Sequence, residues 1–78
     1  MKEPAFKSFR GNAAGLEHAM RQGRIVKFKY RKLDGSTRHA TGRILKAHQD
    51  DMGLEAGVFR YWDMAAGDWR SFHVRNLL

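Results

Sequence analysis

The sequence predicts a mainly β domain, a small curled antiparallel barrel with one short N-terminal helix. Three observations predict it. The chain has 78 residues and no cysteine, which suits one domain with a small core and no disulfide framework. Two stretches of alternating apolar and polar residues each surround a turn signal, as hairpins do. A segment with helical spacing precedes both. We therefore expect one helix and about four or five short strands.

The helix is predicted between Asn12 and Gly23. Asn12 is a suitable N-cap, and Gly23 stands where a left-handed C-cap glycine belongs. Between them, Leu16 and Met20 share one face. Gly15 weakens an isolated helix, so the helix must be stabilised by packing through this apolar face.

Residues 1–11 are expected to form a flexible tail, followed by a single domain over residues 12–78. The tail carries charged residues and the only proline, Pro4. It has no apolar run of the kind a secretory signal peptide contains. No stretch approaches the roughly 20 apolar residues of a membrane span. These observations predict a soluble, cytoplasmic protein without membrane contact.

The first hairpin begins with a strand that has one apolar and one basic face. Its residues are, in order, Val26, Lys27, Phe28, Lys29, Tyr30 and Arg31. A two-residue turn at Asp34-Gly35 would pair Phe28 with Thr41 and place charge on the core face further along. A three-residue loop with Gly35 in the left-handed region pairs Phe28 with Ala40 and keeps the faces consistent. We expect the second register.

The second hairpin is predicted over residues 58–74, after a loop of about a dozen residues at 46–57. A four-residue turn over 64–67 would pair Trp62 with Trp69 and Tyr61 with Arg70. One face would then be mostly aromatic and apolar, comprising Phe59, Tyr61, Arg70, Phe72 and Val74. The opposite face would comprise Val58, Arg60, Trp62, Trp69, Ser71 and His73. Leu77 and Leu78 are expected to close one end of the core.

The two hairpins resemble the small stand-alone WYL-like domains of phages and mobile elements. The matching stretches are residues 26–30, Asp34-Gly35, Arg38, residues 61–63 and residues 69–74. At the position of the Trp-Tyr-Leu run that names the family, this chain has Gly57-Val58-Phe59. The resemblance implies an Sm-like or SH3-like β-barrel. It also implies a regulatory module that senses a nucleotide-like or single-stranded nucleic-acid ligand, with Arg70 and His73 at the basic positions of the closing strand.

Charge is strongly segregated along the chain, whose formal net charge is +7. Residues 24–46 hold eight Lys/Arg against Asp34 alone, whereas residues 47–68 hold Arg60 against five acids. A basic stripe attracts polyanions by releasing their counterions. The predicted contact residues for a nucleic acid or an acidic partner are Lys27, Lys29, Arg31, Arg38, Arg43, Arg60, Arg70 and His73.

Each of three features of the sequence can be interpreted in two ways. Lys27, Lys29 and Arg31 suit phosphate contacts, or a charged edge that blocks unwanted strand pairing. Trp62 and Trp69 could stack on unpaired bases, but they could also be the partner on which the helix packs. Arg70 suits an anion site, or a salt bridge to Asp63, Asp68 or the C-terminal carboxylate.

Nothing in the sequence favours catalysis, a cofactor or a metal. There is no phosphate-binding glycine loop, no nucleophile motif and no zinc-protease spacing among the four histidines. His48 with Asp50 and Asp51 is a weak cation candidate, because such loop carboxylates are usually solvated. We therefore expect a non-enzymatic module that contacts nucleic acid, including RNA or single strands, or a nucleoprotein complex. The alternatives are an adaptor or inhibitor of a host complex and a nucleotide-sensing regulatory domain.

Overall fold

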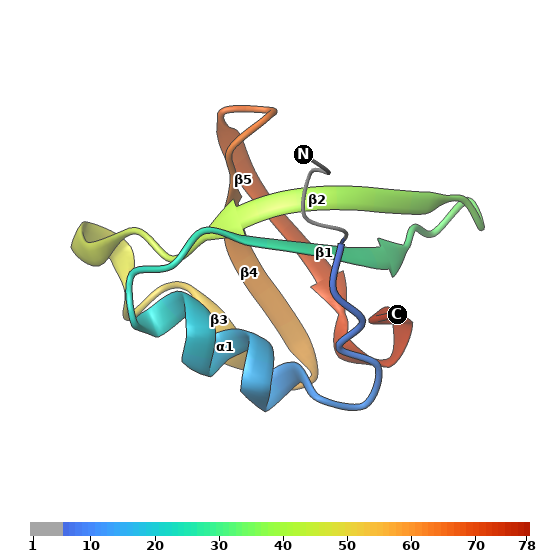
Figure 1. The fold of residues 1–78 in the computed structure, drawn as a ribbon, viewed down its shortest axis with the longest axis horizontal. Helices are drawn as coiled ribbons and strands as arrows, with labels where there is room; N and C mark the ends of the chain where they lie inside the picture. The colour runs from blue at the N-terminus through green and yellow to red at the C-terminus, as the bar shows by residue number, and fades with distance from the viewer. Residues whose placement is uncertain (1–5) are drawn as a thin grey trace, which may run out of the picture.

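The computed structural model describes residues 6–78, which form one helix, five strands and two 3-10 turns (Figure 1). In chain order they are α1 (Ala13–Arg21), β1 (Val26–Arg31), β2 (Thr37–Arg43), η1 (Lys46–His48), β3 (Gly53–Glu55), β4 (Val58–Asp63), β5 (Asp68–His73) and η2 (Val74–Asn76). The predicted mainly β class with one short N-terminal helix is confirmed. No helix within residues 6–78 is long and apolar enough to cross a membrane.

All five strands belong to one antiparallel sheet in which β4 is central. β4 pairs with β2, β3 and β5, and β1 lies beyond β2. In Figure 1 the β1–β2 hairpin crosses the β4–β5 hairpin, and α1 lies beside β3. Within the described residues, the ladders do not close into a continuous barrel. A single bridge between Tyr30 and Leu77 connects the C-terminal end to β1.

The β1–β2 hairpin has the register that the alternation pattern predicted. Phe28 pairs with Ala40. The loop has the expected conformation, with Gly35 in the left-handed region at a φ of +88°. Glycine adopts this conformation at little energetic cost. Asp34 Oδ1 accepts hydrogen bonds from the backbone N–H and the hydroxyl of Ser36, at 2.9 and 2.6 Å. These bonds hold the tip of the hairpin.

The β4–β5 hairpin also has its predicted register. Tyr61 pairs with Arg70, and Trp62 pairs with Trp69. Asp63 fixes the turn, because its Oδ1 accepts from the backbone N–H groups of Ala65 and Ala66 at 3.0 Å each. This is the Asx-type turn bonding expected of an aspartate at that position.

The core is built mainly from aromatic rings on the inner faces of β1, β4 and β5. The rings of Tyr30 and Phe72 stack with centroids 4.4 Å apart, and Phe28 meets Tyr61 edge-on at 5.1 Å. Gly42 leaves the room that these rings need. A Cβ at residue 42 would lie 2.5 Å from Cδ2 of Tyr61 and 3.2 Å from Cε1 of Phe28.

The helix has the expected ends but a different packing partner. Asn12 Oδ1 accepts from Gly15 N at 3.0 Å, and Gly23 has a φ of +84°. The fully buried Leu16 and Met20 join the central core, and α1 packs chiefly on β1, β2 and β3. Of the two interpretations left open for the tryptophan pair, the one in which the helix packs mainly on it is not favoured, although Trp62 packs against the same core as Leu16 and Met20. The rings beside Trp69 are Trp62 and His48.

The structure corrects one further expectation. Residues 53–55, predicted as loop, form the short strand β3. They do so because they pair with the longer strand β4. Of the predicted flexible tail, residues 1–5 lie outside the described residues, and two residues of the remainder bond to the barrel. Lys7 N donates to Lys27 O at 3.0 Å, and Phe9 N donates to Leu78 O at 2.9 Å. Leu77 is buried at the end of the core, as predicted.

Candidate functional site

A cleft of about 1060 Å³ lies between the tip of the β1–β2 hairpin and β5. Residues 30–34 and Arg38 form one wall, and residues 69–73 form another. His48, the last residue of η1, and Asp51 line a third side. The charged residues of the cleft are mostly basic. They are Arg31, Lys32, Arg38, Arg60 and Arg70, against Asp34 and Asp51.

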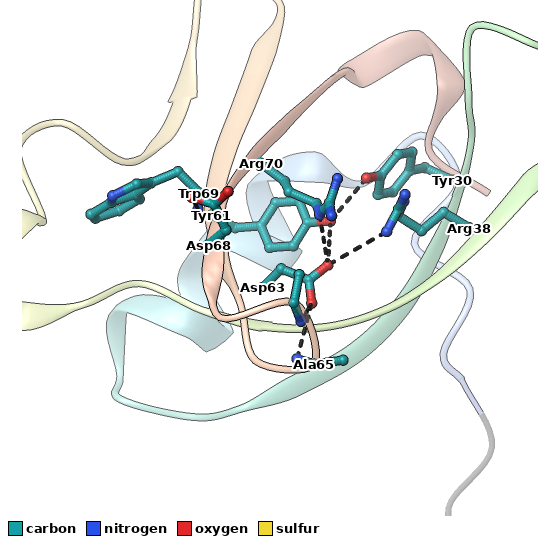
Figure 2. A network of polar contacts seen from close by, with 9 residues as sticks. Tyr30, Arg38, Tyr61, Asp63, Ala65, Asp68, Trp69 and Arg70 are labelled. Atoms are coloured by element: carbon teal, nitrogen blue, oxygen red, sulfur yellow. Dashed lines mark hydrogen bonds and ion pairs between the residues drawn. The ribbon is translucent and has the colours of Figure 1, made fainter.

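An ion-pair network anchors two of these arginines (Figure 2). Arg70 Nε lies 3.5 Å and Arg38 Nη1 lies 3.9 Å from the same oxygen of Asp63, Oδ2. The Asp63 side chain is only 4% exposed, whereas those of Arg38 and Arg70 are 26% and 37% exposed. One carboxylate cannot neutralise two guanidinium groups, so the network leaves positive charge on the cleft.

The salt bridge considered for Arg70 is thus present, and Asp63 is the partner. It does not use up the side chain, because the pair is made by the buried Nε, whereas the side chain is 37% exposed and also lines the cleft. Strand alternation points Arg70 inward, and its position beside the open edge of β5 brings it to the cleft. A fixed guanidinium with free N–H groups is well suited to an oxyanion.

Two tyrosines complete the network from the core side. The hydroxyls of Tyr30 and Tyr61 are 2.9 Å apart, and Tyr61 OH donates to Asp63 Oδ2 at 3.5 Å. Burial, followed by the hydrogen bond with Tyr30, raises the pKa of Tyr61 above its ordinary value. The phenol therefore stays neutral and adds no negative charge beneath the arginines.

The tryptophan pair is divided between core and cleft. Trp62 packs partly against the core, whereas Trp69 is 43% exposed and lines the cleft. The two indole rings meet edge-on at 5.0 Å, and His48 meets Trp69 in the same manner at 5.1 Å. Of the two predicted stacking residues, the structure therefore presents Trp69 at the cleft.

The basic face of β1 has the predicted register but is partly covered. Lys27 and Lys29 are half-buried. Lys27 Nζ lies 5.5 Å from the centre of the Phe6 ring, which also contacts His39 at 5.1 Å. The edge of β1 is bonded as well, because Leu78 N donates to Lys29 O at 3.0 Å. Blocking of strand pairing at this edge therefore does not depend on the lysines alone.

The structure brings six of the predicted residues together and leaves four apart. Those that line the cleft are Arg31, Arg38, Arg60, Trp69, Arg70 and His73. Lys27, Lys29, Arg43 and Trp62 do not line it. Arg43 pairs with Trp62 across β2 and β4, and its buried Nε has no hydrogen-bond partner among residues 6–78.

Sequence reasoning missed Lys32 and His48 as residues of this cleft. Lys32 had a usable signal, because it belongs to the basic segment and stands next to the turn. His48 had none, because only the path of η1 brings its ring to Trp69.

The outer edge of β5 is a further feature of the cleft. Among residues 6–78, β5 pairs with β4 alone. An edge strand directs every other pair of backbone N–H and C=O groups away from its neighbour. These groups lie next to the basic walls described above.

Residues 6–78 contain no group of three or more His, Cys, Asp or Glu side chains placed to hold a metal ion. In the weak candidate on the loop, His48 Nδ1 and Asp51 Oδ2 are 4.0 Å apart.

A family model described as "WYL_2, Sm-like SH3 beta-barrel fold" matches residues 13–78. The match covers α1, all five strands and the C-terminal turn, and it confirms the resemblance based on the two hairpins. Neither a curated protein nor a solved structure matches the chain.

Proposed function

We propose that this chain, which belongs to the WYL_2 family, is a non-enzymatic module that binds nucleic acid through the cleft beside β5. One observation carries the proposal. A single cleft gathers five Lys/Arg side chains against two aspartates and has an exposed indole on its wall. Basic and aromatic side chains in one groove are the combination that nucleic-acid-binding proteins use.

The arginines are suited to phosphate contacts. A guanidinium group presents planar pairs of N–H donors that match two phosphate oxygens. Asp63 restrains Arg38 and Arg70 from below, so less side-chain freedom would be lost when a phosphate binds. Arg31 and Arg60 are more exposed and would add two further phosphate contacts. Contacts of this kind fix position without reading sequence.

Trp69 is suited to stacking against a base. Stacking on an aromatic side chain contributes on the order of 1–3 kcal/mol per base and tolerates any base. The edges of bases in a duplex are accessible but their faces are not. We therefore expect single-stranded DNA or RNA to bind more tightly than a duplex of the same length.

Titration of fluorescently labelled oligonucleotides tests the proposal. Single-stranded DNA, RNA and duplex of one length are compared by anisotropy at low salt. The cleft variant Arg31→Gln/Arg60→Gln is expected to bind at least about 10-fold more weakly than wild type. The control Arg24→Gln/Arg75→Gln removes the same charge at exposed positions that do not line the cleft. Equal losses in the two double variants would refute the cleft as the site.

The free edge of β5 favours a second candidate, an adaptor or inhibitor of a host protein complex. An extended acidic segment could pair with this edge while its side chains meet the basic walls. Such a protein would retain its partner in a lysate pull-down after nuclease treatment and would bind free oligonucleotides poorly. A nucleotide sensor would instead show a thermal shift with mononucleotides.

A further inference from the structure

α1 is joined to residues 49–54, which lead from η1 into β3, by a set of polar contacts that we call the Glu17–Arg21 clasp. Arg21 donates from Nη1 to Gln49 O and from Nη2 to Met52 O, each at 3.0 Å. Glu17 Oε2 accepts from Leu54 N at 2.6 Å and lies 3.4 Å from Arg21 Nη2. Two side chains one helical turn apart therefore bond three backbone groups of the segment 49–54.

Gly53 shows how closely this segment approaches the helix. The residue is buried and has a φ of +94°. A Cβ there would lie 2.4 Å from Glu17 Oε2 and 2.7 Å from Arg21 Nη2. The segment thus lies directly against the two clasp side chains and has little room to shift toward the helix.

The same stretch of chain forms one side of the cleft. His48 and Asp51, which immediately precede or lie within the clasped segment, both line it. The ring of His48 meets Trp69 edge-on. The ion pair between the His48 and Asp51 side chains, at 4.0 Å, is local and exposed, so it contributes little to fixing the wall.

We propose that Glu17 and Arg21 are positioning residues for the cleft. They hold the wall that carries His48 and Asp51 against Trp69, and loosening the clasp widens the cleft and weakens binding. The inference rests on the proposed function as far as affinity is concerned. The position of the wall itself can be measured without any ligand.

Glu17→Ala separates positioning from simple electrostatics, because the two predict opposite changes in the affinity for oligonucleotide. Removing a negative charge from a basic protein by itself favours a polyanion. Loss of the clasp lowers the population of the binding-competent wall, and the apparent affinity falls by the same factor. We expect Glu17→Ala to bind single-stranded oligonucleotide about 5-fold more weakly than wild type.

Asp50→Ala is the matched control. It removes the same charge from an exposed position inside the clasped segment, and Asp50 is not one of the clasp residues. It is expected to bind as wild type or slightly more tightly. Glu17→Gln, which keeps an acceptor for Leu54 N, is expected to recover part of the affinity lost in Glu17→Ala. Glu17→Ala binding as tightly as Asp50→Ala would overturn the inference.

If wild type binds no oligonucleotide, the proposed function is refuted but the clasp is not. Two measurements that need no ligand then test the clasp. The first is hydrogen exchange at the Leu54 amide. The second is the fluorescence of Trp69 in a Trp62→Phe background. Glu17→Ala is expected to accelerate the exchange and shift the emission, with an unchanged melting temperature of the core showing that the chain is folded. Values equal to those of Asp50→Ala would contradict the clasp.

Discussion

At the scale of single residues, Asp63 links the fold to the cleft. Its Oδ1 holds the β4–β5 turn, and its Oδ2 faces both Arg38 and Arg70. A carboxylate this deeply buried is tolerated only where hydrogen bonds and cations satisfy it. The sequence identified Asp63 as a turn residue and as one of three possible partners of Arg70. Asp63 and Arg70 meet within the β4–β5 hairpin, whereas Arg38 reaches the same carboxylate from the other hairpin.

Asp63→Asn is expected to lower the free energy of unfolding by about 2–3 kcal/mol. The amide keeps an acceptor for the turn but leaves two arginines without their shared counter-charge. Urea denaturation measures the change. Asp68→Asn is the control, because Asp68 is exposed and its carboxylate accepts only from Trp69 N in the described structure. A loss no larger than that of the control would contradict the role given to Asp63.

Gly42→Ala is expected to destabilise the fold by about 1–3 kcal/mol through overpacking. The added methyl group would overlap the rings of Tyr61 and Phe28, and buried rings have little freedom to move. Thermal unfolding by circular dichroism measures the loss, with Ser71→Ala at an exposed strand position as the reference. An unchanged melting temperature would show that the two rings can relax.

At the scale of elements, the tip of the β1–β2 hairpin is stabilised by a titratable group. Hydrogen bonds from the side chain and the backbone of Ser36 hold the pKa of Asp34 below its ordinary value of 3.8. A carboxyl group with a depressed folded-state pKa stabilises the folded state above its unfolded pKa. That contribution is lost as pH falls through the folded value.

The tip is therefore expected to stay ordered above about pH 4 and to loosen below it, as Asp34 takes up a proton. An NMR titration of the Asp34 carboxyl, together with the exchange of the Ser36 amide, follows the change. In Asp34→Asn the tip should lose this dependence on pH. A midpoint for Asp34 at or above 3.8 would contradict the hydrogen-bonded tip.

Both hairpins could be predicted from sequence because alternation and turn chemistry are local. The three-residue loop at Gly35 and the four-residue turn after Asp63 fixed both registers. β3 could not be predicted in this way, because three residues give no useful alternation and form a strand only beside β4. The packing of α1 on β1, β2 and β3 likewise depends on contacts distant in sequence.

At the scale of the whole molecule, the charge pattern predicted a basic surface but not its shape. Lys27 of β1 is partly covered by Phe6, whose path could not be predicted from the local sequence pattern. The cleft instead combines the tip of one hairpin with the edge strand of the other, so Arg31 and Arg38 meet Arg60 and Arg70 only in three dimensions. The residue types were predictable, and their grouping was not.

The salt dependence of oligonucleotide binding tests the central claim most directly. For single strands, the slope of log K against log salt is about −0.7 per neutralised phosphate. If Arg31 and Arg60 contact phosphates, Arg31→Gln/Arg60→Gln should reduce the steepness of this slope by about 1.4 relative to wild type. The slope of Arg24→Gln/Arg75→Gln should stay close to that of wild type. No detectable binding at low salt, or equal slopes in the two double variants, would contradict a nucleic-acid-binding cleft.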